Sequence, residues 1–202
     1  MNKKKFTFGA NKKVNFIRIP KNASTSLYNY FGVTNTIRDN YLSVDNEVYK
    51  NIFAPSHCRL EFAIKEFGER ILSLPTLAVI RNPYDRMVSM YFFAQKTKLN
   101  GVYDMDFQNF LEFCEHFQRL SSDPNFFHAW SQKSFIEVDN DTRVDSLLSF
   151  ENLQDFYKKA GVTLKKENST KHEIFKQYYC SKSKKIVENI WGEDIDYFSY
   201  NF

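Results

Sequence analysis

The stretch that decides the fold is FIRIPKNASTSL, residues 16–27. A short apolar run, expected to be a strand from Val14 to Ile19, is followed by Lys21 and a turn rich in hydroxyl groups. A helix is then expected from Thr25 or Ser26 to about residue 31. Backbone N–H groups at such a strand-to-helix turn favour an anion, and Lys21 adds a positive charge beside them. The stretch therefore predicts a site for a phosphate or sulfate group.

A second strand-to-helix junction lies in AVIRNPYDRMVSMY, residues 78–91. The continuous apolar run 76–80 is typical of a central parallel strand, and Pro83 fits the first turn of the helix that follows. Arg81 leaves the strand end and Ser89 lies two helical turns later, so both can face one anion. A guanidinium fork and a hydroxyl suit a phosphate monoester. Arg86 lies elsewhere around the helix, where we expect an ion pair that holds the loop.

The rest of the chain continues the alternation of strands and helices. A further strand is expected over 144–150, a short helix around 45–52, and helical patterns around 60–71, 107–117, 153–160, 173–179 and 184–191. This order predicts one α/β domain over residues 1–202, in three layers with a central parallel sheet flanked by helices, after a flexible segment 1–13. In such sheets the ligand lies beyond the carboxyl ends of the strands, where Lys21 and Arg81 both fall.

Composition narrows the class of protein. Of the 202 residues, 43% are hydrophobic and 17% aromatic, which indicates a packed globule. The net charge of +4 is spread along the chain, so we expect no nucleic-acid partner. Three widely spaced cysteines predict neither a disulfide framework nor a metal site. No window approaches the ~18 apolar residues of a membrane span, so no membrane anchor and a cytoplasmic location are expected.

The two junctions resemble the 5′-phosphosulfate loop and the 3′-phosphate motif of sulfotransferases that use 3′-phosphoadenosine 5′-phosphosulfate (PAPS). The string R-N-P-x-x-R-x-x-S-x-Y is the more specific half. Further segments, 128–132, 144–155 and 194–200, are similar to the carbohydrate branch that includes heparan sulfate 2-O-sulfotransferases, although Ser131 stands where similar proteins often have proline. The resemblance implies a P-loop-like fold, PAPS as donor, adenosine 3′,5′-bisphosphate as product and a hydroxyl acceptor, with glycan favoured. It assigns cofactor binding to Lys21, Asn22, Ala23, Ser24, Thr25, Ser26, Arg81 and Ser89.

Sulfuryl transfer needs a base for the acceptor hydroxyl and a cation for the leaving oxygen. Lys21 is the expected cation. His57 is the favoured base, because it precedes the helix that starts near Leu60, much as a histidine does in the similar 2-O-sulfotransferases. His128 is its rival, but neighbouring aromatic residues more often surround a core or pocket-wall histidine.

Two other classes of function remain open at this stage. A catalytically silent nucleotide- or polyanion-binding module would bind PAPS without transferring sulfate. A P-loop-like phosphoryl transferase would need magnesium-binding carboxylates and a Walker loop, and the anion loop contains no glycine. We favour the sulfotransferase.

Overall fold

The computed structural model describes residues 14–23, 25–27, 57–97, 107–159 and 174–202. The chain forms two compact units: a sheet unit of Met1–Ile80 and Gln132–Asn168, and a helical unit of Arg81–Ser131 and Ser169–Phe202. Three expectations lie outside the described residues: the flexible segment 1–13, the helix around 45–52, and the end of the first helix.

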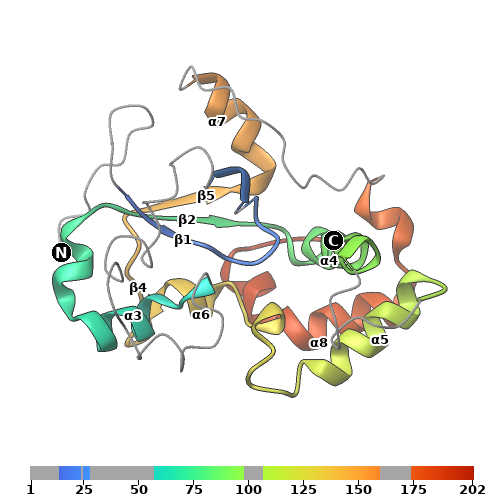
Figure 1. The fold of residues 1–202 in the computed structure, drawn as a ribbon. Coiled ribbons are helices and arrows are strands. Elements are labelled where there is room, and N and C mark those ends of the chain that lie inside the picture. Colours follow the sequence, from blue (N-terminus) through green and yellow to red (C-terminus); the bar gives the residue numbers. More distant parts are fainter. Residues whose placement is uncertain (1–13, 24, 28–56, 98–106, 160–173) are drawn as a thin grey trace. The chain divides into compact units, whose positions relative to one another are not determined.

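The sheet unit is built on three parallel strands in the order β1-β2-β5. They are β1 (Asn15–Ile17), β2 (Thr76–Ile80) and β5 (Ser146–Ser149). Every residue of the central strand β2 is buried, as its continuous apolar run predicts. All three predicted strands are confirmed, and because they run parallel their carboxyl ends lie at one edge of the sheet (Figure 1).

Helices cover both faces of this sheet. On one face, Leu153 and Tyr157 of α7 pack in a buried cluster with Phe16 and Val79. On the other face, the Asn15 amide donates to a backbone carbonyl in η3. Figure 1 shows α7 on one side of the strands and α3 and α6 on the other. These elements are α3 (Leu60–Phe67), η3 (Glu69–Ser73), α6 (Lys133–Ile136), η5 (Phe150–Asn152) and α7 (Leu153–Lys159). The predicted α/β class, with a parallel sheet between helices, is confirmed.

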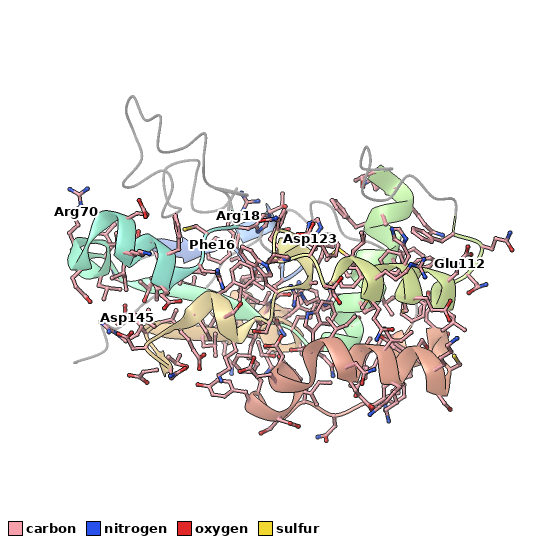
Figure 2. The ribbon with its side chains drawn as sticks, turned by 90° about the horizontal axis from the view of Figure 1, so that it is seen from below. Phe16, Arg18, Arg70, Glu112, Asp123 and Asp145 are labelled. Carbon is pink, nitrogen blue, oxygen red and sulfur yellow. The ribbon has the colours of Figure 1, made fainter. Side chains whose placement is uncertain are left out.

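The register of β2 and β5 is fixed by one carboxylate. Asp145, labelled in Figure 2, accepts hydrogen bonds from the backbone N–H and the hydroxyl of Thr76, at 2.8 and 2.9 Å. The Asp145 backbone N–H donates in return to the Thr76 hydroxyl at 2.8 Å. The first residue of β2 is therefore held opposite the residue that precedes β5.

One predicted helix is shorter than its pattern. The apolar spacing from Leu60 to Ile71 predicts a single helix that stops before Pro75, but α3 ends at residue 67. Gly68 follows with φ 73°, a left-handed conformation that glycine adopts readily, and its N–H donates to the Ile64 carbonyl at 2.7 Å. The chain then continues as the 3-10 helix η3.

The helical unit surrounds an aromatic core. Trp191 is fully buried; its indole N–H donates to the Ala129 carbonyl at 2.8 Å and its ring lies 5.5 Å from that of Phe117. Cys114 is buried in the same core. The helices are α4 (Pro83–Thr97), α5 (Phe110–Leu120), η4 (Phe127–Ala129), η6 (Phe175–Tyr178) and α8 (Ser181–Tyr197). The pattern at 173–179 therefore forms only one 3-10 turn, whereas the pattern at 184–191 belongs to a longer helix.

A short antiparallel hairpin, which the sequence analysis did not predict, completes the sheet unit. It pairs β3 (Glu137–Val138) with β4 (Asp141–Thr142). Within the described part of the chain, no helix combines the length and the apolar character that a bilayer crossing requires.

Candidate functional site

The anion loop, residues 20–27, begins three residues after β1. Lys21 and Ala23 have φ values of 67° and 56°, left-handed conformations that cost a non-glycine residue about 1–3 kcal/mol each. Such residues, alternating with ordinary ones, turn successive backbone N–H groups toward one side and form an anion-binding concavity. The two φ values are of the kind that such a concavity uses, but the N–H of Asn22, which lies between them, donates to the Ile19 carbonyl at 3.4 Å, and the anion cradle stays a prediction.

The helical end of the loop comes next. Thr25–Leu27 are helical, and the Leu27 N–H donates to the Ala23 carbonyl at 3.2 Å. Thr25 and Ser26 are half-buried. Ser24, which the resemblance also assigns to cofactor binding, lies outside the described residues.

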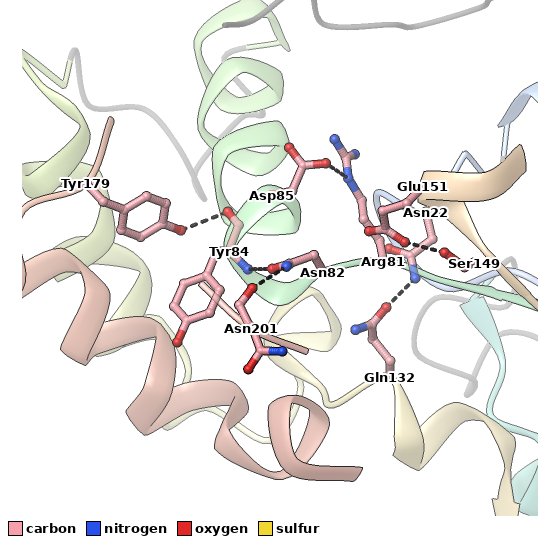
Figure 3. A network of polar contacts seen from close by, with 10 residues as sticks. All are labelled: Asn22, Arg81, Asn82, Tyr84, Asp85, Gln132, Ser149, Glu151, Tyr179 and Asn201. Atoms are coloured by element: carbon pink, nitrogen blue, oxygen red, sulfur yellow. Dashed lines mark hydrogen bonds and ion pairs between the residues drawn. The ribbon is translucent and has the colours of Figure 1, made fainter. Parts of the chain in front are cut away.

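Asn22 holds the loop against the sheet. Its side chain is 1% exposed, and its amide nitrogen donates to the Val79 carbonyl at 2.7 Å and to Gln132 Oε1 at 2.6 Å (Figure 3). Both amide protons are thereby used within the sheet unit. The Asn22 backbone N–H donates to the Ile19 carbonyl at 3.4 Å. Its side chain braces the loop, and its role in cofactor binding stays a prediction.

His57 lies beside the end of β1. Its Nδ1 is 2.6 Å from the carbonyl oxygen of Arg18, the residue that follows the strand. Because a carbonyl can only accept, Nδ1 carries the proton, and in the neutral ring the lone pair is on Nε2. The fold thus brings His57 to the residue three positions before Lys21, with one ring nitrogen suited to accept a proton.

The thiol of Cys58, next to His57 in the chain, is not suited to accept a proton. Cys58 is half-buried, and burial raises its pKa to about 12. The Sγ–H group donates to the Arg59 carbonyl at 3.4 Å. Cys58 therefore stays protonated near neutral pH, which leaves the imidazole as the better base at this place.

Arg81 and Ser89 lie at the start of the helical unit. Arg81 is 5% exposed, and its Nε donates to Asp85 Oδ2 at 2.7 Å, an ion pair across one helical turn (Figure 3). Ser89 follows two turns later on α4 and is 4% exposed. The ion pair fixes the guanidinium through Nε, and a role for Arg81 in phosphate binding stays a prediction.

Asn82 orders the first turn of α4. Its side-chain oxygen accepts from the Tyr84 N–H at 3.0 Å, and its amide donates to the Asn201 carbonyl at 2.9 Å. Figure 3 shows both bonds. The turn that carries Arg81 and Asp85 is therefore held at its amino end by the helix cap and by the chain near residue 201.

Arg86 points into the core of the helical unit and is fully buried. Its Nη1 and Nη2 donate to the carbonyls of Trp130 and His128 at 3.1 and 3.2 Å. Asp194 Oδ2 lies 3.9 Å from Nη1, and the guanidinium carbon lies 4.4 Å from the centre of the Trp191 ring. Arg86 does form an ion pair, but it joins α4 to α8 and does not hold the loop as expected; the two carbonyl bonds join α4 to the segment around η4.

His128 is built into an aromatic setting. Its ring centre lies 4.3 Å from that of Phe127, 5.6 Å from Phe126 and 6.3 Å from Phe93. Together with the bond from Arg86 to its carbonyl, these contacts support the interpretation of His128 as a packing residue.

The predicted site residues fall into two groups. The sheet unit brings His57 close to the strand end that leads into the anion loop, and the helical unit contains Arg81 and Ser89. The contact of Gln132 with Asn22 was not predicted, although Gln132 belongs to one of the segments that carry the resemblance. A buried glutamine has no periodic signature; only its contact with Asn22 reveals its place.

Comparison with known proteins identifies the family of the chain. The model of the sulfotransferase family matches residues 4–201, nearly the whole chain. No curated protein and no solved structure matched. The family match confirms the family predicted from the two strand-to-helix junctions and supports sulfuryl transfer as the general activity. The chain belongs to the sulfotransferase family.

Proposed function

We propose that the protein transfers a sulfuryl group from PAPS to a hydroxyl group of a carbohydrate acceptor. The observation that carries the proposal is the hydrogen bond between His57 and the Arg18 carbonyl at 2.6 Å. It holds an imidazole at the strand end that leads directly into the anion loop. The proposed base, His57, is therefore bonded to the residue three positions before the proposed cation, Lys21.

The donor is assigned to both strand-to-helix junctions. Strands β1 and β2 are parallel neighbours, and Arg81 is bonded to the last residue of β2. The loop N–H groups and Lys21 suit the 5′-phosphosulfate, whereas Arg81 and Ser89 suit the 3′-phosphate of the same nucleotide. PAPS supplies an activated sulfuryl group on its 5′-phosphate.

Two residues of the chain have separate roles in the proposed transfer, His57 as the base and Lys21 as the cation. His57 Nε2 accepts the proton of the acceptor hydroxyl as its oxygen attacks the sulfur, while Nδ1–H remains bound to the Arg18 carbonyl. The Lys21 ammonium stabilises the negative charge that develops on the departing phosphate oxygen. No covalent bond to the protein is needed, because attack and departure occur in line.

The compartment that we propose is the cytoplasm. None of the three cysteines forms a disulfide, and two of them, Cys58 and Cys114, have pKa values raised by burial. Unpaired thiols fit a reducing environment.

Two measurements test the proposed function. Thermal unfolding with adenosine 3′,5′-bisphosphate at 100 times its dissociation constant is expected to show stabilisation of about 2.7 kcal/mol. Labelled sulfate from PAPS is then offered to a panel of glycans, phenols and peptides, and a glycan is expected to become labelled. Binding without transfer to any acceptor would support the silent module, and magnesium-dependent turnover of ATP would support the phosphoryl transferase.

Lys21→Met is expected to lower kcat about 10²–10³-fold, the usual effect of removing one group that stabilises developing charge. Methionine keeps an apolar stem of similar length and removes only the ammonium, so the fold is expected to survive. Steady-state transfer kinetics measure the loss. The matched control is Lys65→Met, an exposed lysine on α3 in the same unit, which should leave kcat unchanged. Equal kcat values for wild type and Lys21→Met would rule out Lys21 as the catalytic cation.

A further inference from the structure

Gln132 contacts the anion loop from a position 110 residues further along the chain. It is fully buried, and its Oε1 accepts the Asn22 amide at 2.6 Å. The same amide donates to the Val79 carbonyl in β2 at 2.7 Å. Asn22 is therefore clamped between the central strand and Gln132, and all three residues belong to the sheet unit (Figure 3).

The anion loop depends on such a clamp. Asn22 stands between two residues in left-handed conformations, and the loop contains no glycine that would adopt them without strain. Strained backbone persists only where surrounding contacts fix it. The backbone bond from Asn22 to Ile19 is long, at 3.4 Å, whereas the two side-chain bonds are short. The Asn22 side chain therefore contributes two short bonds at the middle of the loop, where its own backbone N–H makes only a long one.

Gln132 is itself held firmly. It caps α6, and its backbone carbonyl accepts from the Phe135 N–H at 3.1 Å. Phe135 and Ile136 of α6 are fully buried, and α6 packs against α3. The acceptor oxygen that meets Asn22 is thus carried by a well-packed element and not by the loop.

We propose that Gln132 is a positioning residue that sets the anion loop for the donor, acting through Asn22. This inference rests on the proposed function, because it names what orients the loop that would bind the phosphosulfate. In this proposal Gln132 acts on the loop through its bond with Asn22, and the proton transfer is left to His57. Loss of its acceptor should let the loop relax, so that donor binding weakens while the chemical step, once the donor is bound, changes little.

Gln132→Met tests this, because methionine has a similar length and its thioether is only a weak acceptor for the Asn22 amide. The dissociation constant of adenosine 3′,5′-bisphosphate and the KM for PAPS are expected to rise about 10- to 100-fold, with kcat changed less than about threefold. Both are measured well below the unfolding midpoint of the variant. A purely structural glutamine would lower that midpoint and leave binding intact. The matched control is Gln154→Met, an exposed glutamine on α7. If Gln132→Met does not fold, Gln132→Asn shortens the side chain by one methylene and serves the same measurement.

A double-mutant cycle assigns the effect to the contact with Asn22. If Gln132 acts through Asn22, the variant carrying both Asn22→Ala and Gln132→Met should bind the nucleotide with a loss clearly smaller than the product of the single losses. Losses that multiply, or an unchanged dissociation constant in Gln132→Met, would overturn the proposal.

Amide hydrogen exchange, measured on the protein without nucleotide, tests the contact of Gln132 with the loop independently of the proposed function. Gln132→Met is expected to speed exchange in the peptide that carries residues 16–27 and not in the peptide that carries α7. If wild type bound no nucleotide, the proposed function would fail while this result still supported the clamp. Unchanged exchange in the loop peptide would overturn the clamp, whatever the nucleotide does.

Discussion

His57→Ala is expected to reduce kcat for sulfate transfer about 10²–10⁴-fold, the contribution of a well-placed general base. The reason lies in the orientation of the ring. Its Nδ1 is bound to the Arg18 carbonyl at 2.6 Å, so that Nε2 is the nitrogen able to accept a proton. The variant should bind adenosine 3′,5′-bisphosphate as wild type does, because the imidazole is assigned to the acceptor side. Transfer kinetics and nucleotide titration measure the two effects separately.

The pH dependence provides a second readout of the same assignment. A base works only when it is unprotonated, so the kcat of wild type should rise with pH to a plateau. That acid limb should disappear in His57→Ala. The matched control is His128→Ala, whose ring packs against Phe126 and Phe127 in the helical unit. If His128→Ala loses the acid limb and His57→Ala keeps it, His128 and not His57 is the base.

The parallel sheet could be predicted because its signal is local. Residues 77–80 are continuously apolar, and a run this short, bounded by Pro75 and Pro83, is typical of a strand covered on both faces. The turns after β1 and β2 combine a strand end, basic residues and a helix start within about a dozen residues. Both the fold class and the family follow from such short segments, which a single sequence contains in full.

Features that depend on one residue were harder to predict. The hairpin β3–β4 has strands of only two residues, too short to show any alternation. Its turn residues, Asp139 and Asn140, both have positive φ, at 52° and 62°, as favoured two-residue hairpin turns require. The dipeptide was a usable signal, but without longer flanking strands it does not stand out. Similarly, the end of α3 at Gly68 interrupts an apolar pattern that continues to Ile71.

Contacts between distant segments could not be predicted at all. The bond from Asn22 to Gln132 joins a loop to the cap of a helix 110 residues later, and neither residue type indicates the other. The expectation that Arg86 forms an ion pair came from its place on the helix, but its partner Asp194 lies in α8. Sequence periodicity predicts which face of a helix is buried, whereas the identity of the opposing element depends on packing of the whole unit.

Arg86→Met is expected to lower the free energy of unfolding by about 3–5 kcal/mol, the usual cost of breaking a buried ion pair from one side. The methionine would leave the buried Asp194 carboxylate without this cation and the carbonyls of His128 and Trp130 without their shared donor. It would also end the contact of the guanidinium with the Trp191 ring. Urea unfolding measures the loss. Since α4 carries Arg81 and Ser89, nucleotide affinity should fall as well under conditions in which the unit is only partly folded.

The matched control is the double variant Arg86→Met with Asp194→Leu, in which no uncompensated charge remains. It should be more stable than Arg86→Met alone, because the single variant must keep a carboxylate in an apolar core whereas the double variant need not. Equal stability of the two variants would show that the carbonyl bonds and the Trp191 contact, and not the charge of Asp194, account for the loss.

The free energy of unfolding of Arg86→Lys should lie between those of wild type and Arg86→Met. An ammonium keeps the charge, but it cannot span both carbonyls and cover the indole ring.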